Sequence, residues 1–183
     1  GDPASILKAH RNLERLVDGQ LHYVDGHGER VRVNPASTTR ILFAPRPLLA
    51  TEPSVRDQGA PVPASFFDLA VFASYNAVKL RVRQGGVYLY LHGVHGHGEA
   101  RLWKRLFEYL EESLGLPRGT FRATVFLDSL AGALEADEIL FELDHYSAGL
   151  ALDPQQYVVD HILLFSAPDR AVASGVTISW SSS

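Results

Sequence analysis

The spacing of apolar residues along the chain predicts an alternation of strands and helices. Residues 87–91 and 122–127 are short apolar runs, which are typical of buried strands. Residues 65–80 and 99–114 instead place apolar side chains three and four positions apart, which predicts two helices with one buried face each. Gly115 follows the second of these patterns directly, where glycine commonly ends a helix.

Polar residues mark where the predicted helices start. Ser65 is followed by Asp68 three residues later, a spacing close to the capping box of a helix N-terminus. Ser129 is expected to cap a third helix that runs to about Tyr146 and is ended by Gly149.

The first third of the chain is expected to be loop-rich. Residues 5–17 predict a short helix, residues 20–33 a hairpin around a glycine turn, and residues 40–44 a short strand. Residues 45–63 contain five prolines and are expected to form an exposed loop. At the other end, residues 157–165 are apolar enough for a further strand or a buried helix.

This order of elements predicts an α/β fold with parallel strands and right-handed crossovers. We expect one domain over residues 1–183, in which residues 1–63 hold the hairpin and the first strand and residues 64–183 hold the βα units. About four βα units are present, whereas a complete eight-stranded barrel needs roughly 250 residues. The chain therefore predicts a partial barrel, an open sheet, or an assembly with another chain. Chemistry is expected at the C-terminal strand ends, namely residues 44–46, 92–93 and 128–129 and those after 157–165.

Composition narrows the possible partners. The net charge is −4 and the basic residues are scattered, so neither nucleic acid nor an anionic membrane surface is an expected partner. The chain has no cysteine, which excludes disulfides, thiolate metal sites and a cysteine nucleophile. With no targeting signal, we expect a cytoplasmic protein, and the absence of methionine suggests an excised or processed segment.

Several segments, in the right order, resemble the malate synthase family, and its A-type isoform most. Residues 116–125 (LPRGTFRATV), 135–140 (EADEIL) and 145–150 (HYSAGL) match family motifs, as do 99–103 (EARLW) and 65–68 (SFFD). The resemblance implies a partial TIM-type (β/α) barrel. It also implies a reaction in which an aspartate base deprotonates acetyl-CoA, and the enolate attacks glyoxylate polarised by Mg2+ and an arginine.

The resemblance assigns family roles to particular residues, and several are substituted. Ala44 stands where the family keeps its catalytic arginine, and Arg46 matches the second arginine of that motif. Asp128 matches the first metal carboxylate, and Gln156, which is neutral, matches the second. Gly93 replaces a family lysine, and the aspartate base has no counterpart. Arg46 is therefore the candidate catalytic residue, and Asp128 and Gln156 are the candidate ligands of Mg2+.

These substitutions predict a malate synthase-like domain with weak or no activity as an isolated chain, because loss of one oxyanion donor alone commonly costs about 10²–10³ in rate. If active, it would use acetyl-CoA and glyoxylate. The alternatives are a noncatalytic binding or scaffold module and a site repurposed for another acyl-CoA or 2-oxoacid. Either a homo-oligomer or the remainder of a longer chain is expected to complete the fold.

A second possible metal site lies in the loop after residues 87–91. His92, His95 and His97, with Glu99, form an H-x-x-H-x-H-x-E pattern, and imidazoles suit zinc, nickel or copper. The alternative is a solvated glycine-rich loop with incidental histidines.

Overall fold

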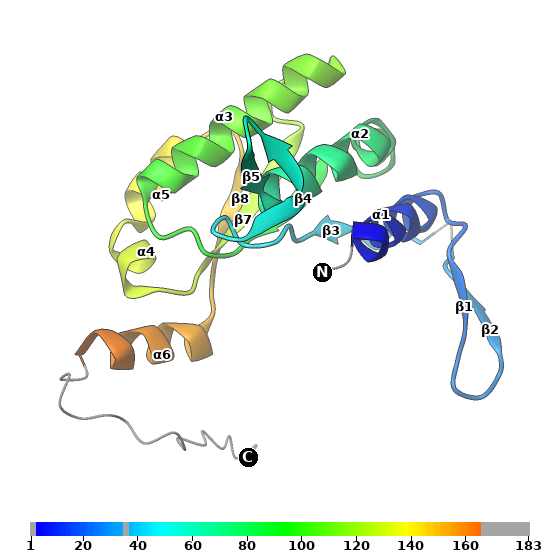
Figure 1. Cartoon of the computed structure of the whole chain (residues 1–183), viewed down its shortest axis with the longest axis horizontal. Helices are drawn as coiled ribbons and strands as arrows, with labels where there is room; N and C mark the ends of the chain where they lie inside the picture. The colour runs from blue at the N-terminus through cyan, green and yellow to red at the C-terminus, as the bar shows by residue number, and fades with distance from the viewer. Residues whose placement is uncertain (1–2, 35–36, 166–183) are drawn as a thin grey trace.

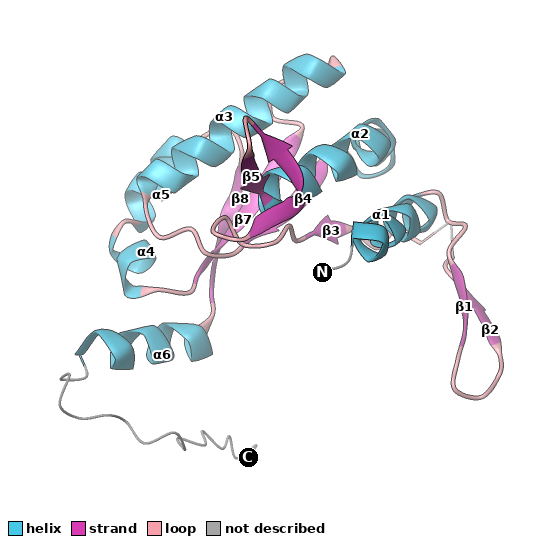
Figure 2. Ribbon diagram, viewed as in Figure 1, coloured by secondary structure: helices cyan, strands magenta, loops and turns pink. Residues whose placement is uncertain are grey.

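A four-stranded parallel sheet organises the molecule (Figures 1 and 2). The computed structural model describes residues 3–34 and 37–165. The sheet order is β3-β6-β7-β8, and its bounds are Leu42–Phe43 for β3, Val87–Leu91 for β6, Phe121–Leu127 for β7 and Ser147–Leu152 for β8. The order follows the chain and every pairing is parallel, which confirms the predicted βα organisation.

Helices α2 (Ala64–Gln84) and α3 (His97–Leu114) carry the chain between successive parallel strands. Two short helices, α4 (Leu130–Leu134) and α5 (Ala136–Glu142), make the next crossover, and α6 (Pro154–Phe165) follows β8. No described helix is both long and apolar enough to cross a membrane.

The hydrophobic core lies between the helices and one face of the sheet. Alternate residues of β6 and β7 are fully buried, as expected for strands with one face against helices. Trp103 and Phe107 of α3 pack here, and Phe107 stacks on Phe121 with ring centroids 5.4 Å apart. The buried helix residues repeat at the predicted spacing, so the apolar pattern of α2 and α3 is confirmed. Gly115 is in the left-handed conformation, with φ at 63°, and ends α3 as predicted.

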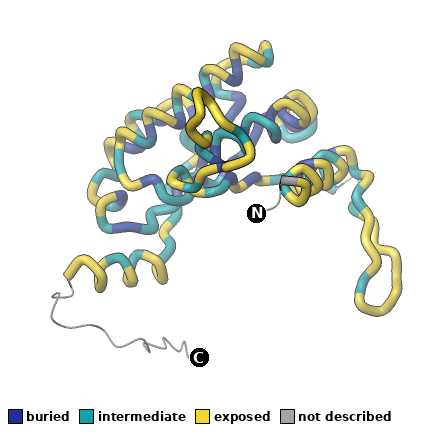
Figure 3. Tube along the Cα trace, viewed as in Figure 1, coloured by how far each residue is buried: buried dark blue, intermediate teal, exposed yellow. Residues whose placement is uncertain are grey.

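The N-terminal elements also follow the prediction. Helix α1 (Pro3–Val17) packs on α2, and strands β1 (His22–Val24) and β2 (Arg30–Arg32) form the antiparallel hairpin, with every strand residue exposed (Figure 3). Lys79 of α2 joins α1 through Asp18, with Nζ 2.9 Å from a carboxylate oxygen.

The proline-rich stretch 45–63 is not the loop we expected. It contains a second antiparallel hairpin, β4 (Thr51–Asp57) and β5 (Ala60–Pro63), whose turn has positive φ angles at Gln58 and Gly59. A two-stranded ribbon tolerates proline because each strand has an unpaired edge, and the pairing is irregular between Glu52 and Arg56.

Three expectations near the C-terminal half are also corrected. The predicted single helix from Ser129 to Tyr146 is broken at Glu135 into α4 and α5, although Ser129 does cap α4 by accepting from Gly132 N at 3.1 Å. Gly149 lies inside β8 and does not end a helix. Residues 157–165 belong to a helix, α6, but none of its residues is buried. The strand end of the fourth unit is therefore the one after β8.

The predicted capping box at the start of α2 is absent. The helix begins at Ala64 after Pro63, and no side chain caps it. Ser65 is buried without a hydrogen-bond partner for its hydroxyl in the described structure, and the Asp68 carboxylate binds Arg46 instead. Asp68 is therefore in an ion pair with Arg46 and does not cap the helix.

Candidate active site at the strand ends

The C-terminal ends of β3, β6 and β7 lie together, as the parallel sheet predicts. Gly93, just after β6, donates its backbone N–H to Asp128 Oδ2 at 2.8 Å, and Asp128 directly follows β7. A Cβ placed on Gly93 would lie 3.8 Å from the Cβ of Pro47, in the segment after β3. Three of the predicted strand ends therefore meet at one edge of the sheet.

Arg46 is held by two acidic side chains at this edge. Its Nε donates to Asp68 Oδ2 at 2.8 Å and its Nη2 to Asp68 Oδ1 at 2.7 Å, a bidentate pair. The backbone N–H of Arg46 also donates to Asp68 Oδ2, at 3.2 Å. Its Nη2 lies 3.0 Å from Glu52 Oε2 on β4. One guanidinium therefore faces two carboxylates, and this triad of Arg46, Asp68 and Glu52 has a formal charge of −1.

The two acids of the triad are buried, and their charge depends on Arg46. Glu52 is fully buried and Asp68 is 6% exposed, whereas the Arg46 side chain is 34% exposed. Burial alone would raise the pKa of Asp68, but hydrogen bonds from Arg46 and His10 outweigh it and hold this pKa well below its ordinary value. Hydrogen bonding from Ser54 and the Arg46 charge lower the pKa of Glu52 despite burial. The pKa of Arg46 is raised, chiefly by Asp68.

Asp128 is the acidic side chain that directly follows β7. One carboxylate oxygen accepts from Gly93, and the other is buried without a hydrogen bond in the described structure. His95 is the nearest titratable neighbour, with Nε2 3.8 Å from Asp128 Oδ1. A buried oxygen without a donor is a position that a cation or a ligand hydroxyl would satisfy.

Gln156 does not join Asp128 through any contact of its side chain that the structure shows. It lies exposed in the first turn of α6, where its backbone N–H donates to Asp153 Oδ1 at 3.1 Å. Asp153 is in turn tied to the end of β7 by its own N–H, which donates to the Leu127 carbonyl at 3.2 Å.

The predicted magnesium ligands are therefore one carboxylate and one neutral amide. This donor set does not fit a resident Mg2+, which prefers charged oxygen ligands in near-ideal octahedral geometry. Over residues 3–34 and 37–165, no three side chains of His, Cys, Asp and Glu gather closely enough to hold a metal ion.

The three histidines after β6 have different neighbours. His92 stacks on Phe126 with centroids 4.4 Å apart, and His95 faces Asp128. His97 begins α3, where its Nδ1 lies 2.7 Å from Glu135 Oε2. The structure does not bring the three imidazoles together.

Two residues of the site were missed by sequence reasoning. Glu52 was assigned to an exposed loop, and nothing in its local pattern marks it as buried. Asp68 did carry a signal, because it lies four residues before Phe72 on the apolar face of α2. An acid on a buried helix face requires a cationic partner, and Arg46 is that partner.

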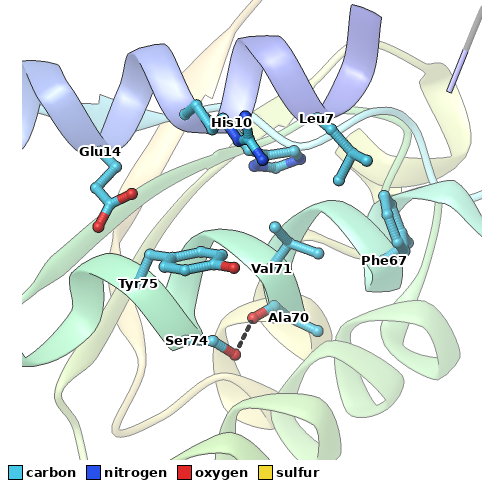
Figure 4. Close-up of a pocket in the computed structure, with 9 residues that line it drawn as sticks. Leu7, His10, Glu14, Phe67, Ala70, Val71, Ser74 and Tyr75 are labelled. Atoms are coloured by element: carbon cyan, nitrogen blue, oxygen red, sulfur yellow. Dashed lines mark hydrogen bonds between the residues drawn. The ribbon is translucent and has the colours of Figure 1, made fainter. Parts of the chain in front are cut away.

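A cavity of about 500 Å3 lies between α1 and α2, and its lining residue His10 also reaches the triad, with Nε2 3.7 Å from Asp68 Oδ1. Its lining is mostly apolar, with Leu7 of α1 facing Phe67 and Val71 of α2, and His10 and Glu14 add polar groups (Figure 4). None of the residues predicted to be catalytic or metal-binding lines this cavity.

Comparison with known proteins agrees with this architecture. The family model described as "Malate synthase, TIM barrel domain" matches residues 41–174. Malate synthase from Myxococcus xanthus (strain DK1622) is 34% identical over 169 residues, which is 92% of this chain and 31% of that protein. Glyoxysomal malate synthase from Candida tropicalis is 33% identical over 186 residues, covering 91% of this chain and 33% of that protein.

Malate synthase A from Escherichia coli (strain K12) is 30% identical over 168 residues, covering 91% of this chain and 31% of that protein. The chain thus spans about a third of the length of these curated relatives. Its four parallel strands correspond to part of a barrel, as expected from the resemblance. With a family model matching most of its length, the chain belongs to the malate synthase family and forms part of that family's TIM barrel domain.

Proposed function

We propose that this chain is a malate synthase-type barrel module that has little or no condensing activity by itself. The family reaction requires a cationic group free to stabilise negative charge on the glyoxylate carbonyl oxygen. Arg46 is the cationic residue of the predicted strand ends 44–46, 92–93 and 128–129, and its guanidinium is already paired with Asp68 and Glu52. The pairing of Arg46 with Asp68 and Glu52 is the observation that supports this proposal.

The electrostatics explain why Arg46 is a poor substitute for the missing arginine. Two buried carboxylates already surround its guanidinium, so a developing oxyanion beside it would meet a cluster with an overall negative charge. Freeing Arg46 would leave two buried acids without a cation, which is strongly unfavourable. Ala44, Gly93 and Gln156 supply no charge in its place. We therefore expect this chain to keep the barrel fold and to have lost most of the condensing activity.

A thiol assay tests the proposal directly. Release of CoA from acetyl-CoA in the presence of glyoxylate and Mg2+ is followed with a thiol-reactive dye, and the chain contributes no background because it has no cysteine. Malate synthase A from E. coli serves as the positive control. We expect a rate at least about 10²–10³ below the control, because that is the usual cost of losing one oxyanion donor. Turnover within about tenfold of the control would refute the proposal.

Binding separates a scaffold from a repurposed site. Titration calorimetry with Mg2+, glyoxylate and acetyl-CoA, each alone and then together, should show no saturable binding of Mg2+ at millimolar concentration. Asp128→Asn is the matched variant, since it keeps the shape and the contact from Gly93. If Mg2+ binds the native chain and not this variant, a metal site at Asp128 persists and the donor-set argument is wrong.

We also propose that the protein is located in the cytoplasm.

A further inference from the structure

The cavity between α1 and α2 has apolar walls that come from both helices. Its volume of about 500 Å3 lies within the range of pockets that hold small organic molecules. Figure 4 shows Leu7 of α1 across from Phe67 and Val71 of α2. Leu7 is 51% exposed and the other two residues are half-buried, so a ligand can reach the walls. A hydrocarbon group bound here would remove apolar surface from water.

The charged group available at this cavity is a cation. Arg11 of α1 lines the cavity and is exposed, and its guanidinium forms no hydrogen bond or ion pair with any described residue. Glu14, which also lines the cavity, is different because its Oε1 lies 3.4 Å from Lys79 Nζ. A guanidinium without an acidic partner favours a carboxylate, which can accept two parallel hydrogen bonds from it.

Tyr75 of α2 adds a hydroxyl to the facing wall. Figure 4 shows this residue beside Val71 on the cavity side of the helix. It is 55% exposed, and its hydroxyl has no hydrogen bond over residues 3–34 and 37–165. The neighbouring Ser74 hydroxyl is already used, since it donates to the Ala70 carbonyl at 2.7 Å. A tyrosine can donate its O–H to a carboxylate while its ring contacts an apolar group.

His10 connects the cavity with the triad. It lines the cavity and is 7% exposed, and its Nε2 lies 3.7 Å from Asp68 Oδ1. Its ring also packs edge to face with Phe67, with centroids 6.3 Å apart. A molecule that contacts the Phe67 ring would therefore lie near the His10 ring as well, next to the acid that Arg46 pairs with.

We propose that this cavity binds a small monocarboxylic acid with an apolar body. The hydrocarbon part contacts Leu7, Phe67 and Val71, and the carboxylate accepts hydrogen bonds from Arg11 and Tyr75. A neutral molecule would leave the guanidinium without an anion, and a second carboxylate would place a charge against apolar walls. The proposal does not depend on the proposed function, because no residue predicted to be catalytic lines the cavity.

Titration calorimetry of the 183-residue chain with 3-phenylpropanoate tests the site. We expect saturable one-to-one binding with a Kd below about 1 mM, which a ligand of this size can reach. 3-Phenylpropan-1-ol lacks the charge and acetate lacks the apolar body, so each should bind at least about tenfold more weakly. The proposal fails if 3-phenylpropanoate shows no saturable binding, or if all three molecules bind equally.

Two arginine variants separate a specific contact from general attraction to a basic helix. Arg11→Gln should weaken the binding of 3-phenylpropanoate at least about tenfold, because the charged hydrogen bonds are lost. Arg15→Gln is the matched control, since Arg15 is exposed on the same helix and does not line the cavity. It should bind the acid as the native chain does. Equal weakening in both variants would overturn the proposal.

A third variant tests the apolar wall, and NMR tests the location. Val71→Phe fills part of the cavity and should abolish binding, with circular dichroism confirming that the variant is folded. In the native chain, 3-phenylpropanoate should shift the NMR signals of Leu7, His10 and Val71. Shifts centred on Asp128 would place the acid at the strand ends and overturn the proposal. Failure to bind the acid would leave the result of the CoA-release assay unaffected, so the two proposals fail separately.

Discussion

At the scale of single residues, Arg46 shows how the same side chain can serve structure or chemistry but not both. Its bidentate contact with Asp68 and its contact with Glu52 join the segment after β3 to α2 and to the β4–β5 hairpin. Buried acids cost free energy unless a cation accompanies them, so the contribution of Arg46 to stability depends on the two carboxylates it neutralises.

Replacing Arg46 should therefore destabilise the fold. We expect Arg46→Ala to lower the free energy of unfolding by about 2–4 kcal/mol, because it leaves two buried carboxylates without their cation. Urea denaturation followed by circular dichroism measures the change. Arg56→Ala is the matched control, because the Arg56 guanidinium donates to the Gly59 carbonyl at the exposed hairpin turn and not to a buried acid in the described structure. Its effect should stay within about 0.5 kcal/mol, and an equal loss in both variants would contradict our account of the triad.

A second buried network lies at the opposite end of the strands and predicts a pH effect. Glu111 accepts from Thr120 N at 2.7 Å and from the Tyr146 hydroxyl at 2.9 Å. Burial, with a smaller effect of Glu111, raises the pKa of Tyr146 to about 12. The folded state thus keeps a proton that the unfolded chain has lost, and the Tyr146 contribution to stability falls as pH rises from about 10 to about 12.

Tyr146→Phe should remove this dependence. At pH 8 we expect a loss of about 1–2 kcal/mol from the missing hydrogen bond to a buried acid. The difference between the native chain and the variant should then shrink as pH rises from about 10 to about 12. Chemical denaturation at a series of pH values measures both effects. Tyr109→Phe, at a 65% exposed position, controls for general alkaline effects; a difference that stays constant with pH would argue against the assignment.

At the scale of elements, close backbone approach holds α4 against the end of β6. A Cβ on Gly132 would lie 2.9 Å from the Val94 carbonyl oxygen and 3.2 Å from Ser129 Oγ, so this position requires glycine. The contact places the start of α4, and with it the loop that carries Asp128, beside the loop after β6.

Gly132→Ala should therefore cost about 1–3 kcal/mol, because backbone atoms must shift to admit the methyl group. Gly98→Ala is a matched change near the start of α3, where a Cβ would meet nothing within 4 Å. That variant should be unchanged or more stable by up to about 1 kcal/mol, since alanine favours helix over glycine. Thermal melts compare the stability of the two variants. Equal destabilisation of Gly132→Ala and Gly98→Ala would show that the contact with Val94 does not determine the loss of stability.

Elements with a clear apolar period could be predicted, and those decided by distant partners could not. The apolar run at 87–91 and the helical spacing in 99–114 depend on local packing faces, and the strand and the helix that they predict are both confirmed. The β4–β5 hairpin was missed because its prolines lie on a two-stranded ribbon, where each strand has a free edge. The cap at Ser65 failed because Asp68 pairs with Arg46, a residue 22 positions away that no local pattern identifies.

At the scale of the whole molecule, the predicted topology brought three of the expected strand ends together. Parallel strands bring their C-terminal ends to one edge, so the proximity of Gly93, Asp128 and the segment around Arg46 followed from the alternation of strands and helices. The ion pairs of the site could not be predicted from the topology. Which acids face Arg46 depends on where β4 folds back, and the burial of Glu52 depends on contacts that the sequence does not reveal by spacing.

The uneven burial across the molecule predicts an uneven opening of its structure. Local opening is easiest where few apolar groups are buried, so backbone amides of the β1–β2 hairpin, whose strand residues are all exposed, should exchange fastest among the strands. Amides of β6 and β7, whose alternate side chains are buried, should exchange slowest, close to the global unfolding limit. Hydrogen–deuterium exchange read by mass spectrometry measures this order. Helix α6, which has no buried residue, should be less protected than β6 and β7. If α6 or the β1–β2 hairpin were as protected as β6, burial would not govern the local opening of the chain.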